Sequence, residues 1–289
     1  MSTLKNKNRL LYIILILILV LLCLFIKLFD NKIHISNYNI EADLKNSISI
    51  VQISDIHNSV FGDNNIELVE KITNVKPHII VITGDLIVSD CDNLEIATDL
   101  IGQLAKIAPV YISYGNHEIE FEQRTGTNLT EVFSNSGATI LNKNYIDTEI
   151  NGEEVRIGGI YGYCLPKEYK KYGIVEDEIE FLRDFEATDK YKILLSHLPY
   201  SWTNYGVSQY YNIDIVFAGH MHGGQVRIPL IGGLWDSELG LFPGKCSGVY
   251  ESFDTITVLS TGLGNTNKNI PRINNPPEIV IVTLGVNYE

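Results

Sequence analysis

The stretch Ala218-Gly219-His220-Met221-His222-Gly223-Gly224-Gln225 holds two histidines, one residue apart, between an apolar run and a pair of glycines. The run Ile213–Ala218 predicts a strand, so the two imidazoles are expected at the start of the loop that follows it. Taken alone, the stretch could equally be a polar turn that contains two histidines, because a short motif is only a hypothesis.

Four other segments share this form, in which an apolar run ends in Asp, Asn or His. They are Ile53-Ser54-Asp55-Ile56-His57, Thr83-Gly84-Asp85, Tyr114-Gly115-Asn116-His117-Glu118 and Leu195-Ser196-His197. Together with the first stretch they contain five of the seven histidines of the chain. Strand ends that each carry a metal-ligating residue type are what a metal site in an α/β protein requires, which favours one shared site over five unrelated turns.

Predicted strands and helices alternate along the chain. Short β-branched runs at 48–54, 78–83 and 110–113 predict buried strands, and helical spacing at 64–75 and 93–105 lies between them. This order is typical of a parallel sheet covered by helices, with its sites at the carboxyl ends of the strands. Further strands are predicted at 33–38, 139–141, 145–150, 154–160, 191–196, 213–218, 255–260 and 278–284, and further helices at 128–136 and 174–187. Two alternating sets of strands indicate an α/β fold in which two mixed sheets pack as a sandwich with flanking helices.

The N-terminal segment contains an unbroken apolar run of 17 residues, Leu10–Ile26. A membrane-spanning helix needs about 20 apolar residues, and Lys27 near the end of this run can extend to the interface. A cleaved signal peptide is the alternative, but the run exceeds the ~7–15 residues of a signal core and no small-x-small site follows it. We therefore expect a transmembrane anchor over residues 10–29.

The charges beside this segment predict its orientation. Lys5, Lys7 and Arg9 precede it, and basic residues favour the cytoplasmic side of a membrane. Residues 1–9 are therefore expected in the cytoplasm. A linker is expected over 30–46, followed by one extracytoplasmic domain over 47–289 at the cell membrane.

Charge and cysteine content exclude several classes of function. After residue 32 the chain has 17 Lys and Arg against 34 Asp and Glu, and such an acidic domain repels a phosphate backbone. No nucleic-acid partner is expected. Cys91, Cys164 and Cys246 are scattered and form no Cys-x-x-Cys pair, so neither a disulfide framework nor a zinc ribbon is expected.

The residue types in the five segments favour hydrolysis at phosphorus. Asp, Asn and His without Cys suit divalent Mn, Fe or Zn. Two such ions about 3.5–4 Å apart clamp the attacking and leaving oxygens of a phosphoryl displacement, and a metal-activated hydroxide is the nucleophile. The chain contains no Gly-x-Ser-x-Gly, no phosphate-cradling Gly-x-x-x-x-Gly-Lys and no His-Glu-x-x-His, which are signatures of other hydrolases and nucleotide sites.

The order Asp-x-His, Gly-Asp, Gly-Asn-His-Glu, His and Gly-His-x-His resembles the calcineurin-like metallophosphoesterases. Three later pieces, Gly223-Gly224-Gln225, Thr261–Gly264 and Asn274–Glu278, are similar to the membrane-associated bacterial phosphodiesterase branch of that family. The resemblance covers about residues 45–287. It implies a four-layer α/β/β/α fold and a metallophosphoesterase domain over 47–289.

The resemblance also implies roles for eight side chains. Seven are implied as ligands of two metal ions: Asp55, His57 and His222 for the first, Asn116, His197 and His220 for the second, and Asp85 between them. His117 would stabilise the charged transition state or protonate the leaving alkoxide. The chain departs from the family pattern at Val88, where many members carry an acidic residue that orients this histidine. Asp90 lies two residues further on, so the partner of His117 stays open.

Other residues have structural alternatives. Glu118 is expected to cap or neutralise locally, and Arg124 and Arg272 could meet a substrate phosphate or lie on the solvated surface. His78 is expected to be structural. An aromatic group could line a cleft or pack in the core: Trp202, Tyr205, Tyr210, Tyr211 and Trp235.

The sequence thus predicts a membrane-anchored, dinuclear metal hydrolase of phosphate esters. Proximity to the bilayer favours a lipid-linked phosphodiester or pyrophosphate as substrate, and a small-molecule phosphodiesterase is the alternative among enzymes. A non-catalytic scaffold that kept the fold would be expected to have lost one of the motif residues, and all are present. A metal store would need no proton donor such as His117 beside the ions.

Overall fold

The computed structural model describes residues 2–29, 32–164, 176–265 and 271–285, and its first sheet has six strands. In spatial order these are β1 (His34–Ile40), β16 (Glu278–Leu284), β2 (Ile48–Ile53), β3 (Ile79–Thr83), β4 (Val110–Ser113) and β5 (Ala138–Ile140). Strands β2 to β5 run parallel, and β16 pairs antiparallel with β2. The carboxyl ends of β2, β3 and β4 therefore meet at one edge of the sheet.

The second sheet also has six strands and is also mixed. In spatial order these are β14 (Gly248–Ser252), β15 (Thr255–Leu259), β9 (Ile215–Ala218), β8 (Tyr191–Ser196), β7 (Glu153–Ile160) and β6 (Asn144–Ile150). The four inner strands run parallel, and the edge strands β14 and β6 pair antiparallel with their neighbours. Asn151 and Gly152 form the turn between β6 and β7, both with positive φ, as a two-residue Asn-Gly hairpin requires.

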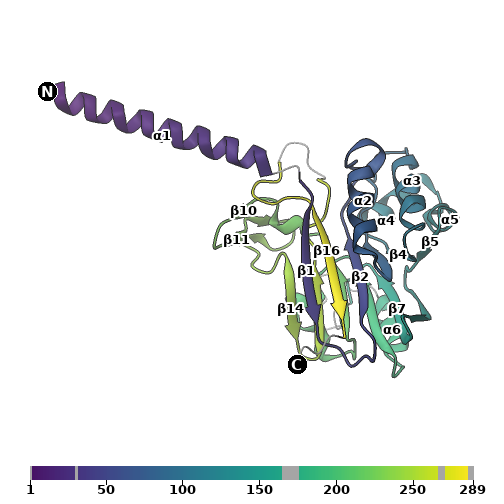
Figure 1. Ribbon diagram of the computed structural model, residues 1–289. Helices are drawn as coiled ribbons and strands as arrows, with labels where there is room; N and C mark the ends of the chain where they lie inside the picture. Colours follow the sequence, from purple (N-terminus) through teal and green to yellow (C-terminus); the bar gives the residue numbers. More distant parts are fainter. Residues whose placement is uncertain (1, 30–31, 165–175, 266–270, 286–289) are drawn as a thin grey trace.

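Period-two burial within the strands explains how the layers pack. In β3, Ile80 and Ile82 face the helices, whereas Ile79 and Val81 face the second sheet. The helices that cover the first sheet are α2 (Ile66–Val75), α3 (Glu95–Leu104), α4 (Asn116–Thr125) and α5 (Leu129–Asn135) (Figure 1). Helices α6 (Glu176–Phe185) and α7 (Tyr200–Thr203) pack with the outer face of the second sheet. The two mixed sheets with flanking helices predicted from the sequence are confirmed.

Several elements differ from the expectation. Helix α4 was not predicted, because most of its residues are polar and its first turn belongs to the Gly-Asn-His-Glu segment. Two small hairpins beyond β9 were not predicted either, because strands of two residues are too short to show alternation. They comprise β10 (Arg227–Ile228) with β11 (Gly232–Gly233), and β12 (Trp235–Asp236) with β13 (Gly240–Leu241).

Helix α1 (Ser2–Phe29) precedes the sheets and extends away from them (Figure 1). In the part of the chain that the structure describes, no helix is long and apolar enough to cross a membrane. The side chains of Leu10, Leu11, Leu24 and 26–29, within the expected anchor, lie outside the described part. The edge strand expected at 33–38 forms as β1, so much of the expected linker belongs to the first sheet.

Candidate metal centre

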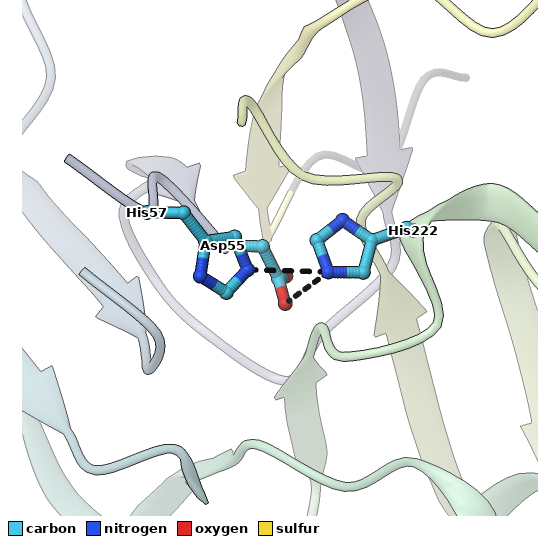
Figure 2. A group of neighbouring side chains, drawn as sticks. All are labelled: Asp55, His57 and His222. Carbon is cyan, nitrogen blue, oxygen red and sulfur yellow. Dashed lines mark hydrogen bonds and ion pairs between the residues drawn. The ribbon is translucent and has the colours of Figure 1, made fainter. Parts of the chain in front are cut away.

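All five polar segments converge between the two sheets. Each begins where a strand ends: after β2, β3 and β4 in the first sheet, and after β8 and β9 in the second. Figure 2 shows Asp55 and His57, from the loop after β2, pointing toward His222, from the loop after β9. The structure therefore brings together all eight residues that the sequence predicted for the site.

The first cluster consists of Asp55, His57 and His222. The Nε2 atoms of the two imidazoles lie 3.2 Å apart, and His222 Nε2 lies 3.6 Å from Asp55 Oδ1. Burial lowers the pKa of both histidines to about 3, so both rings are neutral at physiological pH. Two neutral imidazoles and one carboxylate facing one point are a donor set for a divalent cation.

The second cluster consists of Asp85, His197, His220 and Asn116. His197 Nε2 lies 3.1 Å from His220 Nδ1, 3.3 Å from Asn116 Oδ1 and 3.4 Å from Asp85 Oδ2. The other ring nitrogen of His197 lies 2.7 Å from the Thr83 carbonyl oxygen and donates to it, so Nε2 is the atom that faces the cluster.

Asp85 joins the two clusters. Its Oδ2 lies 3.4 Å from His197 Nε2 in one cluster and 3.8 Å from His57 Nε2 in the other. Burial alone would raise the pKa of Asp85, but the facing imidazoles hold it well below its usual range. Burial alone would lower the pKa of His197, but the Asp85 carboxylate raises it to about 9. A positive charge beside Asp85 is thus strongly favoured.

The loops that carry these side chains are strained. Five predicted ligands have φ in the left-handed region: Asp55 (51°), His57 (49°), Asp85 (52°), His220 (71°) and His222 (47°). Such backbone conformations cost on the order of 1–3 kcal/mol each and cluster at functional sites. A Cβ at Gly115 would overlap Asp85 Oδ1, so the close approach of these two loops requires glycine there.

Glu118 has a larger role than the local cap expected from the sequence. Its buried carboxylate accepts hydrogen bonds of 2.8 Å from the backbone N–H groups of Asp85, Leu86 and Gly115, and one of 3.2 Å from Ile87. It therefore ties the Asp85 loop to the start of α4. The place of Glu118 in the Gly-Asn-His-Glu segment was the only indication of this role in the sequence. Its hydrogen bonds to the Asp85 loop, about 30 residues earlier, could not be predicted from that segment.

His117 lies at the edge of both clusters. Its ring is 4.8 Å from that of His57, and its backbone N–H donates to Asp85 Oδ1 at 3.0 Å. The partner left open by Val88 is the backbone N–H of Ser89, which donates to His117 Nδ1 at 3.0 Å. Asp90 is exposed and is not this partner.

A cavity of about 390 Å³ opens beside the clusters. One side is lined by polar residues of the site, including Asn116 and His117. Val226, Leu234 and Trp235 also line the cavity, next to Asp236 and Ser237. Candidate metal-ligating side chains and apolar side chains thus line one space, which is large enough for a small organic phosphate.

The structure shows the surroundings of the residues for which the sequence left more than one role open. Arg272 is buried and donates to the backbone carbonyls of Thr261, Gly264 and Asn275 at 2.7–2.9 Å, so it supports a loop. Arg124 forms a surface ion pair of 2.6 Å with Asp92. His78 is structural, since its Nδ1 accepts from the Ser49 N–H at 2.9 Å. Of the aromatic group, Trp202 is a core residue and Trp235 lines the cavity.

Comparison with known proteins agrees with this geometry. The profile of the family described as calcineurin-like phosphoesterase matches residues 48–224. An uncharacterized metallophosphoesterase of Aquifex aeolicus is 26% identical, over 87% of this chain and 92% of its own. The phosphodiesterase YaeI of Escherichia coli is 25% identical over 63% of each chain. A bovine "transmembrane protein with metallophosphoesterase domain" is 26% identical, over 63% of this chain and 41% of its own.

Proposed function

This chain belongs to the calcineurin-like phosphoesterase family, and on that premise we propose that it hydrolyses phosphodiester or pyrophosphate bonds at two divalent metal ions. The family and the candidate metal-ligand groups make it a metal-dependent phosphoesterase. The observation that supports hydrolysis at two metal ions is that the Asp85 carboxylate lies beside both clusters of candidate ligand atoms.

The donor set fits two cations. Asp55, His57 and His222 would hold the first ion, Asn116, His197 and His220 the second, and Asp85 both. The Asp85 carboxylate and the unusually basic His197 indicate that positive charge is stabilised where the second ion would bind. Nitrogen and oxygen ligands without sulfur favour Mn, Fe or Zn. Such ions would supply a nucleophile at neutral pH and neutralise charge on the phosphoryl oxygens.

The proposed role of His117 is to donate a proton to the leaving oxygen. Because Nδ1 accepts a hydrogen bond from Ser89, the neutral ring carries its proton on Nε2. His117 lines the cavity, so a phosphate ester bound there would lie within reach of this proton. Glu118 positions His117 and Asp85 by holding both loops.

We further propose that residues 10–29 anchor the chain in the cell membrane, with the N-terminus in the cytoplasm and the catalytic domain outside. The apolar run, the exposed apolar side chains over 12–22 and the basic residues before it support this proposal. The bovine relative is likewise described as a transmembrane protein. The apolar side chains that line the cavity favour a lipid-linked substrate over a free nucleotide.

Hydrolysis of chromogenic phosphodiesters and monoesters by the detergent-solubilised full chain tests the phosphoesterase. Activity should require Mn²⁺, disappear with chelator and disappear in Asp85→Asn, while the exposed Asp90→Asn stays active. A higher rate on the diester would support the phosphodiesterase. Equal hydrolysis with chelator and with Mn²⁺ would contradict the proposal.

A further inference from the structure

Exposed apolar side chains gather on the two hairpins β10–β11 and β12–β13. Among the described residues outside α1, five of the eleven exposed large apolar side chains fall between residues 230 and 242. We call these five the apolar rim: Leu230, Ile231, Trp235, Leu241 and Phe242. Single exposed apolar residues are ordinary, but a contiguous group marks an interaction surface.

The rim residues lie on two hairpins that are joined to each other. Trp235 and Leu241 are directly opposite each other across the β12–β13 pair. The Leu234 N–H donates to the Val226 carbonyl at 2.8 Å, which joins this hairpin to the strand pair that carries Leu230 and Ile231.

Two rim residues, one in the β10–β11 turn and one directly after β13, have an unfavourable backbone conformation. Leu230 has φ of 69° and is fully exposed, and Phe242 has φ of 57° and is 54% exposed. Bulky side chains rarely adopt positive φ, and glycine or asparagine would adopt it at lower cost. Large apolar side chains at strained, exposed positions therefore indicate a function outside the folded core.

The hairpins lie at the end of the molecule where the chain leaves for α1. The Arg227 N–H donates to the Ile273 carbonyl at 2.9 Å, and the His34 N–H at the start of β1 donates to the Pro277 carbonyl at 2.7 Å. Both contacts are made by the short segment 273–277. In the view of Figure 1, β10 and β11 are drawn just below the C-terminal end of α1.

We propose that the apolar rim inserts into the bilayer in which α1 anchors the chain and holds the mouth of the cavity at the lipid surface. The inference rests on the proposed membrane anchor. Residues 228–235 carry no charged side chain, and an uncharged segment with one Trp suits the membrane interface, where charges are costly and Trp is favoured. Because Trp235 belongs both to the rim and to the cavity wall, an acyl chain of a bound phosphoester has a continuous apolar path into the bilayer.

Fluorescence of the full chain in vesicles tests the rim. The chain has two tryptophans, Trp235 and the buried Trp202, so the emission that is lost in a Trp235→Phe variant is that of Trp235. The chain is reconstituted into phosphatidylcholine vesicles with and without bromine on the acyl chains. We expect bromolipid to quench the Trp235 emission, and Leu230→Asp with Phe242→Asp to abolish this quenching. Neither substituted residue lines the cavity, so hydrolysis of a water-soluble diester should be unchanged.

Two results would overturn the inference. If aqueous iodide quenches Trp235 and bromolipid does not, Trp235 lies in water. This holds even when the chain co-floats with the vesicles in a density gradient, because α1 alone would bind the chain to them. A concentration-dependent dimer in detergent that disappears in Leu230→Asp would assign the rim to a second copy of the chain instead. Hydrolysis of the soluble diester by the same preparation tests the phosphoesterase separately. If the chain hydrolyses the diester but bromolipid does not quench Trp235, the membrane insertion is wrong and the proposed enzyme stands. If quenching occurs without hydrolysis, the reverse holds.

Discussion

The backbone N–H of Ser89 donates a hydrogen bond of 3.0 Å to Nδ1 of His117. An acidic side chain at position 88 would instead accept a hydrogen bond from Nδ1–H. The direction of the hydrogen bond is therefore reversed in this chain, and the neutral imidazole presents Nε2–H to the cavity. The Ser89 carbonyl accepts from Arg124 at 2.9 Å, and its hydroxyl donates to Glu120 at 2.8 Å, so α4 holds the residue that orients its own histidine.

Replacing Ser89 by proline removes this N–H donor. We expect Ser89→Pro to lower kcat for diesters with alkoxide leaving groups by a large part of the ~10²–10⁴-fold that a general acid contributes. Hydrolysis of a p-nitrophenyl diester, whose leaving group needs little protonation, should fall much less. Ser89→Ala keeps the N–H and should resemble the parent chain. An equal loss on both substrates would show that the loop, rather than the histidine, had been disturbed.

His117→Ala tests the proton donor itself. The substitution should reduce kcat/KM by ~10²–10⁴-fold for alkoxide leaving groups, with bound metal unchanged because the residue is not a proposed ligand. Metal content is measured by elemental analysis beside the activity. His34→Ala, at an exposed position of β1, is the matched control. Loss of metal in His117→Ala would contradict the assigned role.

Glu118→Gln should destabilise the folded chain by roughly 1–3 kcal/mol, because a carboxamide cannot accept from all four backbone N–H groups that the carboxylate holds and leaves at least one buried donor unpaired. Denaturant unfolding of the full chain in detergent measures this change. The exposed Glu131→Gln is the control. Unchanged stability in Glu118→Gln would mean that these loops keep their arrangement without the carboxylate.

Glu178 on α6 predicts a pH dependence of stability. Burial raises the pKa of its carboxyl from 4.5 to about 7, although the backbone N–H groups of Tyr161 and Gly162 oppose the shift. The folded state therefore binds this proton more tightly than the unfolded state. The protonated Glu178 carboxyl therefore contributes to the free energy of unfolding, and this contribution is fully present below pH 4.5. As the pH rises to about 7, the contribution is lost, which lowers the free energy of unfolding by about 3 kcal/mol.

Unfolding of Glu178→Gln at several pH values isolates this contribution, because the variant keeps every other titrating group. Between pH 4.5 and 7 its free energy of unfolding should fall less than that of the parent chain. Glu180→Gln, at an exposed position of the same helix, should follow the parent. Parallel curves for all three chains would contradict the shifted pKa.

The sequence predicted the layers and the segments that converge at the site because both depend on local patterns, and the family resemblance implied the individual ligands. Buried strands such as β3 are uninterrupted apolar runs, and each proposed ligand follows such a run directly in the chain. The contacts that hold the site were beyond sequence reasoning. Ser89 acts through its backbone N–H, which every residue except proline possesses, and Glu118 acts on groups about 30 residues away. The apolar rim was missed because its strands have only two residues each.

The central claim is that Asp85 is shared by two metal ions. Electron paramagnetic resonance of the metal-stripped full chain during titration with Mn²⁺ tests it directly. The account predicts a spin-coupled spectrum at two ions per chain, replaced by the spectrum of isolated ions in Asp85→Asn and retained in Asp90→Asn. A spectrum of isolated, uncoupled Mn²⁺ in the unaltered chain at full occupancy would contradict the shared carboxylate and the dinuclear mechanism built on it.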